Sequence, residues 1–182
     1  GSLLHVLMSN GLLHCARNLN EIVPPIVRHL VRVGCSLSDL NMKGRTPLMI
    51  YLDGMQATHA RVDCFITLLS MPTVDVAVKN TQGQSLLHRI AEGNVYFHAA
   101  YHLKDIILPM VSKILEMGGS LNDVDLTGRT PMMTFCQFLE PASSSVECFM
   151  EILSLPTVDV TTKDPNGYTL LQYLMIVNRS LG

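Results

Sequence analysis

The sequence contains no tryptophan, and aromatic residues make up only 5% of it. Side chains on which the bases of single-stranded nucleic acid could stack are therefore scarce. Positive charge is not in excess either, because 13 lysines and arginines stand against 15 aspartates and glutamates, for a formal net charge of -2. Binding to a phosphate backbone needs a broad positive field. We therefore expect no nucleic-acid partner.

Long apolar runs are also absent. A membrane-spanning helix needs about 20 consecutive apolar residues, whereas even the stretch from Ile22 to Val33 contains prolines, arginine and histidine. Nothing resembles a secretory signal, which would combine a basic start with a long apolar segment. With 48% hydrophobic and 15% charged residues in 182, the composition is typical of a well-packed soluble protein that inserts into no membrane.

The cysteines exclude two further classes. Five of them form an odd set without a C-x-x-C pair, at positions 15, 35, 64, 136 and 148. This pattern argues against a disulfide framework and against a zinc knuckle. A reducing, intracellular location, cytoplasmic or nuclear, is the simplest expectation.

An internal repeat is the strongest signal in the sequence. The stretch from Gly44 to His88 returns without a gap as the stretch from Gly128 to Gln172, 84 residues later. Within it PTVDV recurs letter for letter. A finer pattern, glycine followed by any residue, Ser or Thr, and then Pro or Leu, begins at residues 44, 83, 128 and 167, at spacings of 39, 45 and 39. Two alternating repeat types were therefore duplicated as a pair.

Each unit of the finer pattern predicts two helices. Thr46-Pro47 and Thr130-Pro131 offer a capping hydroxyl and a proline suited to the first turn, and Ser85 and Thr169 take the capping place in the other units. Apolar stretches predict first helices over 48–52, 86–91, 132–136 and 170–177. Apolar residues at helical spacing predict second helices over 62–70 and 146–154. The Asn or Asp three residues before each pattern glycine predicts a tight hairpin.

Two helices and a hairpin leading into Thr-Pro-Leu resemble the unit of the ankyrin family, over essentially the whole chain. The resemblance implies an all-α fold, an ankyrin-repeat solenoid of stacked helix-turn-helix units with projecting β-hairpin loops. The chain would be a single domain over 1–182, with repeats at about 2–40, 41–79, 80–124 and 125–163 and a partial unit over 164–182. The family unit has about 33 residues, so the connections between helices are enlarged, at 54–61, 93–104 and 140–145.

Motifs that carry chemistry are scarce. His98 and His102 are four residues apart, which is half of a metal-site pattern, but no third ligand is placed nearby. The resemblance gives His5 and His88 a structural role, as hydrogen-bonding links between neighbouring loops. Paired carboxylates, Gly-rich phosphate loops and Ser/His/Asp arrangements are absent. We expect no catalytic residue, no cofactor and no metal, and therefore not an enzyme.

Several sulfur-containing side chains are predicted to fill the core. Cys64 and Cys148 fall on apolar faces of second helices, and Cys136 stands where the family prefers a small residue. Cys15 lies in a less regular stretch and is the candidate for a reactive thiol. Most of the 11 methionines fall at helix positions, and Met42, at a hairpin tip, is the clearest exception.

The resemblance places recognition along the row of hairpin tips and first-helix ends on the concave side. The sixteen tip positions contain five cations and no carboxylate, which favours a peptide or protein partner with acidic and apolar residues. The alternative is that these cations are ordinary surface residues. The candidate partner-binding residues are Leu40, Met42, Lys43, Arg45, Lys79, Gln82, Gln84, Leu126, Arg129, Lys163, Tyr168 and Phe138.

The expected function is a protein–protein interaction module, a scaffold within a larger protein. The chain starts at a capping serine and stops about one helix into its last repeat, which would leave the apolar residues of 170–177 with little cover. Two alternatives stay open. One is a regulatory or substrate-targeting region of a multidomain enzyme, and the other is a transcription-regulatory scaffold.

Overall fold

The computed structural model describes residues 1–10, 18–55, 58–93, 103–139 and 143–179, which form nine α-helices and no β-strand. The all-α fold class is confirmed for these residues. The six helices predicted by residue range are present, with ends that differ by at most three residues. The helices are α1 (Leu3–Met8), α2 (Leu19–Arg32), α3 (Pro47–Asp53), α4 (His59–Leu69), α5 (Leu86–Gly93), α6 (Leu103–Glu116), α7 (Pro131–Gln137), α8 (Ser143–Leu153) and α9 (Leu170–Arg179).

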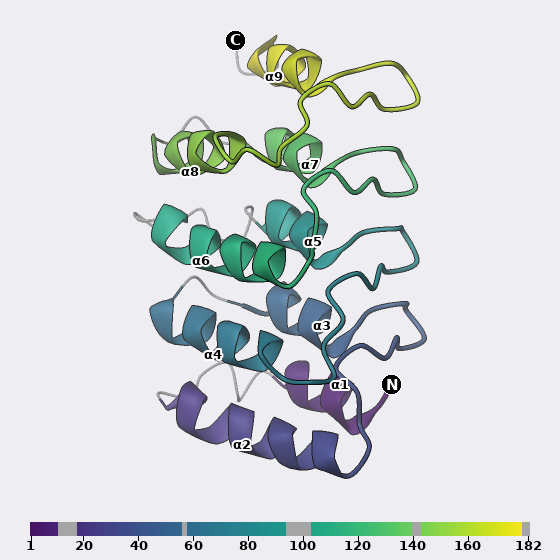
Figure 1. Cartoon of the computed structure of the whole chain (residues 1–182), viewed down its shortest axis with the longest axis vertical. Helices are drawn as coiled ribbons and strands as arrows, with labels where there is room; N and C mark the ends of the chain where they lie inside the picture. The colour runs from purple at the N-terminus through teal and green to yellow at the C-terminus, as the bar shows by residue number, and fades with distance from the viewer. Residues whose placement is uncertain (11–17, 56–57, 94–102, 140–142, 180–182) are drawn as a thin grey trace.

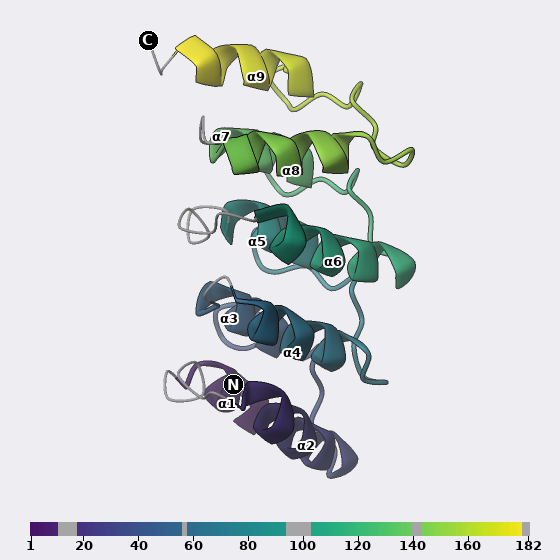
Figure 2. The same cartoon turned by 90° about the vertical axis from the view of Figure 1, so that its left-hand side faces the viewer.

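The helices stack in two columns (Figure 1). The first helices α1, α3, α5, α7 and α9 form one column, the second helices α2, α4, α6 and α8 form the other, and each helix contacts the next one in its column. The loops that lead into α3, α5, α7 and α9 project to the same side of the stack, and Figure 2 shows the same succession of layers from another direction. Loop tips that are far apart in the sequence therefore form one row.

Two of the first helices begin with the predicted threonine cap. The Oγ1 of Thr46 accepts a hydrogen bond from the backbone N–H of Met49 at 3.2 Å, and Thr130 and Met133 repeat this arrangement at the same distance. The cap satisfies one of the N–H groups that a helix start leaves without a partner. The Thr-Pro pairs thus fix where α3 and α7 begin.

The caps of α5 and α9 differ from the prediction. The backbone N–H of Ser85 donates to Nδ1 of His88 at 3.2 Å, and that of Thr169 donates to Oε1 of Gln172 at 2.8 Å. The side chain of the third helical residue is therefore the acceptor in these two caps. The sequence predicts that the hydroxyl of Ser85 caps α5. In the structure its Oγ instead contacts Nδ1 of His88, at 2.9 Å.

The projecting loops are turns and contain no strand within the described ranges, contrary to the expected β-hairpins. In the loop before α5, the Oδ1 of Asn80 accepts the N–H groups of Gln82 and Gln84, both at 2.9 Å. A strand ladder needs such groups for its own pairing. Neighbouring loops share one backbone hydrogen bond here, from the N–H of Leu126 to the carbonyl of Gln82 at 2.9 Å, which is too little to make a sheet.

The core runs along the stack, between successive layers and between the two columns, and contains the three cysteines assigned to it. Cys64, Cys136 and Cys148 are each 0% exposed, so this prediction is confirmed. Most of the methionines in helices are buried as expected, although Met150 and Met175 are more than half exposed. Cys15 lies outside the described residues, as do His98 and His102.

The core thiols are expected to be chemically inert. Burial raises the pKa of Cys136 to about 12, and the pKa of Cys148 also to about 12, with a further contribution from nearby Glu151. The thiolate is the reactive form. In native protein at pH 8, both thiols should react with a disulfide reagent at least about 100-fold more slowly than half-buried Cys35, as followed by mass-spectrometric mapping. Equal rates in native and urea-unfolded protein would contradict this assignment.

The outer face of α9 is partly exposed, as the sequence predicts. Leu171, Met175 and Ile176 are 61%, 59% and 49% exposed, whereas Leu170 is buried and Leu174 is half-buried. Those two side chains pack inward against the preceding layer. No helix in the described part of the chain is long and apolar enough to cross a membrane.

Candidate partner-binding surface

The row of loop tips presents two large apolar side chains to solvent. Met42 and Leu126, which occupy equivalent places in loops 84 residues apart, are 98% and 77% exposed. Each follows an Asn or Asp whose Oδ1 accepts two backbone N–H groups of the same loop, at 2.8–3.0 Å. Those bonds tie the turn together around the tip residue. Leu40 and Tyr168 are also exposed, at 49% and 41%.

Two of the five predicted tip cations are paired with carboxylates that lie outside the tips. The Nη1 of Arg45 lies 2.5 Å from Oδ2 of Asp53, and the Nζ of Lys79 lies 3.7 Å from Oδ2 of Asp123. Two of the five tip cations are thus neutralised from within the chain. The sequence-based count included only the tips, whereas these carboxylates lie at the end of α3 and just before the next loop.

Three tip cations keep their charge available. In the described residues Lys43 and Lys163 are exposed and pair with no carboxylate. Arg129 donates from Nη1 to the amide oxygen of Gln137 at 2.7 Å, a neutral partner at the position that Asp53 holds in the other copy. The positive character of the surface therefore comes from these three side chains.

An ionic bridge fills the step between α3 and α5. Arg89 of α5 pairs with Asp53 of α3 and with Glu92 of its own helix. The side-chain amide of Gln84 also donates to Glu92, and its oxygen accepts from Nδ2 of Asn80 at 2.9 Å. Gln84 is only 6% exposed, so the structure places this predicted contact residue beneath the surface. Arg89 is not among the residues predicted from the sequence, where its one signal is the i,i+3 spacing to Glu92.

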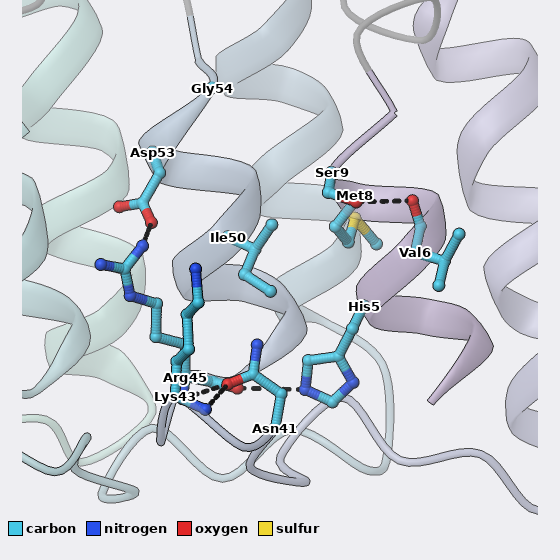
Figure 3. A pocket seen from close by; sticks show the side chains of 10 residues that line it. All are labelled: His5, Val6, Met8, Ser9, Asn41, Lys43, Arg45, Ile50, Asp53 and Gly54. Atoms are coloured by element: carbon cyan, nitrogen blue, oxygen red, sulfur yellow. Dashed lines mark hydrogen bonds and ion pairs between the residues drawn. The ribbon is translucent and has the colours of Figure 1, made fainter. Parts of the chain in front are cut away.

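A groove of about 600 Å³ opens one step earlier, between α1 and α3. Figure 3 shows apolar side chains of both helices facing it, with Lys43 and Arg45 on the loop side and Asp53 at the far end. We call it the α1/α3 groove. It is lined by His5, Val6, Met8, Ser9, Asn41, Lys43, Arg45, Ile50, Asp53 and Gly54.

A second groove of about 340 Å³ lies between α5 and α7, and we call it the α5/α7 groove. Its α7 side repeats the α3 side of the first groove, 84 residues later, with altered side chains. Thr134 replaces Ile50, Gln137 replaces Asp53, and half-buried Phe138 replaces a glycine. It is lined by Thr81, Gln82, Gln84, Glu92, Asp125, Leu126, Thr127, Arg129, Thr134, Gln137 and Phe138.

His88 anchors the loop that carries Arg129. Its Nδ1 accepts from Ser85, so Nε2 carries the proton and donates to the carbonyl of Arg129 at 3.0 Å. The predicted role of His88 as a link between neighbouring loops is confirmed, and His5 makes the equivalent contact with the carbonyl of Arg45 at 3.0 Å. Burial lowers the pKa of His88, although the bond to Arg129 opposes this shift. The imidazole is therefore neutral at pH 7.

A carboxylate helps to hold the same loop. Burial alone would raise the pKa of Asp125, but hydrogen bonds from Thr127 and Arg129 outweigh it and lower the pKa below its usual value. Asp125 is therefore ionised at neutral pH and is engaged in shaping the loop. Its charge is consequently not free to attract a partner.

No model of a known protein family matches the chain, and no curated protein matches it in sequence. Within the ranges described, no group of three His, Cys, Asp or Glu side chains could hold a metal ion. The arrangement on this face consists of grooves, apolar tips and cations.

Proposed function

We propose that the chain is a protein–protein interaction module of the ankyrin-repeat type, which binds a segment of a partner protein along the loop tips and first helices. The observation that carries this proposal is the exposure of Met42 and Leu126, at 98% and 77%. Neither side chain contributes to the core, and both recur at the same place in the duplicated unit. Exposed apolar groups rimmed by polar residues are typical of interaction sites.

The cations on this surface indicate which residues a partner segment should carry. Lys43, Arg129 and Lys163 favour a segment with acidic residues beside its apolar ones, since complementary charges steer encounter. Exposed pairs contribute only about 0 to 1 kcal/mol each. Affinity should therefore come mainly from apolar burial, and charge should act mainly on the association rate.

The proposal predicts which substitutions weaken binding. Replacing Met42 and Leu126 together with serine should raise the Kd of a partner, isolated by affinity purification, at least about tenfold in surface plasmon resonance. Lys43→Glu with Lys163→Glu should instead slow association and reduce its dependence on salt. Both double variants should keep the native melting temperature, because these side chains are exposed.

Met150→Ser is the matched control. Met150 is also an exposed methionine, at 53%, but it lies on α8 in the other helix column. If the partner binds the Met42/Leu126 double variant as tightly as it binds Met150→Ser, recognition does not use the loop tips and the proposed function fails.

A further inference from the structure

The steps along the first-helix column are not alike. The α1/α3 and α5/α7 steps are hollowed into grooves, whereas Arg89 and its two carboxylate partners occupy the α3/α5 step between them. The grooves lie at equivalent places in the 84-residue duplication. They are therefore two related sites separated by a step whose charges are already paired.

Each groove has apolar side chains in its lining and a cation that pairs with no carboxylate in the described residues. In the α1/α3 groove, Val6 and Ile50 line the hollow, and Lys43 stands at the loop side without a carboxylate partner in the described residues. The lining of the α5/α7 groove is mostly polar, and Leu126 and Phe138 supply its apolar contacts. Its two carboxylates are already engaged, Glu92 by Arg89 and Asp125 by N–H groups of its own loop. Arg129 is bonded to a neutral amide. Both grooves thus suit an apolar side chain that is next to an acidic one.

The distance between the grooves sets the spacing of such pairs. The grooves are two layers apart, and packed helices lie about 8–10 Å from each other, which gives a separation of about 16–20 Å. An extended chain advances about 3.3 Å per residue and places every second side chain on the same face. Six residues therefore cover about 20 Å and keep both side chains on one face.

We propose that the two grooves act together and bind one extended partner segment that carries two acidic–apolar pairs, with their apolar side chains at positions i and i+6. This inference rests on the proposed function and specifies the partner that the surface recognises. Charge complementarity with Lys43 and Arg129 argues for the acidic residues. The filled α3/α5 step lies beneath the spacer, whose side chains are not selected.

Synthetic peptides test the spacing directly. Fluorescein-labelled peptides with two Asp-Leu pairs, joined by Ser/Thr spacers that set the leucines 4, 5, 6, 7 or 8 positions apart, are titrated by fluorescence anisotropy. The peptide with spacing 6 should bind at least about tenfold more tightly than a peptide with one pair, because the second contact is intramolecular. Spacings 5 and 7 should bind like the single pair, since they turn one leucine away.

Variants of the chain show whether both grooves take part. Lys43→Thr introduces the residue found at the equivalent position 127, and Phe138→Ala trims the other groove. Each should reduce binding of the spacing-6 peptide at least about fivefold, and the preference over spacings 5 and 7 should disappear. Arg28→Thr is the control, because Arg28 is an exposed cation on α2, in the other helix column, and its loss should leave the spacing preference unchanged.

Equal affinity for all spacings, no binding of the spacing-6 peptide, or equal effects of Lys43→Thr and Arg28→Thr would overturn the two-groove proposal. The interaction function would still stand if a partner lost affinity on the Met42/Leu126 substitution. Failure of that second test would remove the function itself, so the two failures are distinguishable.

Discussion

Replacing His88 with alanine should lower the free energy of unfolding by about 3 kcal/mol, as measured by urea denaturation. The imidazole is fully buried and joins two loops, since Nδ1 accepts from the N–H of Ser85 and Nε2 donates to the carbonyl of Arg129. Alanine would leave both backbone groups without their partner, at about 1–3 kcal/mol for each buried group, and would also leave a cavity.

A glutamine at the same position is the informative control. Gln172 accepts the N–H of Thr169 at the start of α9, so His88→Gln should keep this part of the cap and lose less than half as much stability as His88→Ala. A second control is Gln172→Ala. Gln172 is exposed, so its replacement should cost less than 1 kcal/mol. Equal losses for all three variants would show that the imidazole bridge is not what stabilises this step.

The contribution of His88 should also appear in the pH dependence of the melting temperature. The pKa of His88 is lowered in the folded state from the usual 6.5, so the unfolded chain takes up this proton first as the pH falls. The wild-type melting temperature should therefore decrease as the pH drops below 6.5, and His88→Gln should lack that part of the decrease. The carboxyl of Asp125 contributes only below its usual value of 3.8, because its folded pKa is lowered further.

Much of the fold could be predicted because the sequence contains two copies of the same structural unit. Tyr51 and Phe65 stack with ring centroids 6.0 Å apart, and Phe135 and Phe149, at the equivalent positions, lie 5.6 Å apart. At these helix positions the aromatic residue is buried in both copies. Cys64 and Cys148 also recur on the apolar face of the second helix in both copies, so their burial could be predicted without knowledge of the layer geometry.

The contacts between layers could not be predicted in the same way. The pairing of Arg89 with Asp53 joins residues 36 positions apart and depends on how one first helix stacks on the next. Local sequence therefore gave no sign that Gln84 would be buried beneath the loop surface. In the described residues the loops likewise form no sheet, because pairing between neighbouring loops depends on the offset of adjacent layers, and that offset allows one backbone bond near Gln82.

The candidate surface was predicted in outline and not in detail. The tip residues Met42 and Leu126 could be placed from the turn pattern alone. The grooves could not, because each lies between two first helices and depends on how one layer stacks on the next. The side chains that line them come from segments about 40 residues apart, which the turn pattern does not bring together.

Replacing Gly83 with alanine is the second substitution with a large expected effect, a loss of about 3 kcal/mol in the free energy of unfolding. Gly83 has φ +75°, where a side chain costs about 1 kcal/mol or more. In addition, a Cβ would lie 2.8 Å from the backbone nitrogen of Leu126, a distance that forces the neighbouring loop to move. That movement would break the hydrogen bond from Leu126 to the carbonyl of Gln82, at 2.9 Å.

Gly167→Ala distinguishes the cost of the backbone conformation from the cost of the contact between loops. Its φ is +83°, nearly that of Gly83, but a Cβ there would meet no atom within 4 Å. Gly167→Ala should therefore cost only about 1 kcal/mol, the backbone term alone. If the two glycine variants unfold at the same urea concentration, close contact between loops does not stabilise the stack. If Gly83→Ala is the weaker one as expected, it should also bind the spacing-6 peptide less tightly than Gly167→Ala does, because the displaced Leu126 lines the α5/α7 groove.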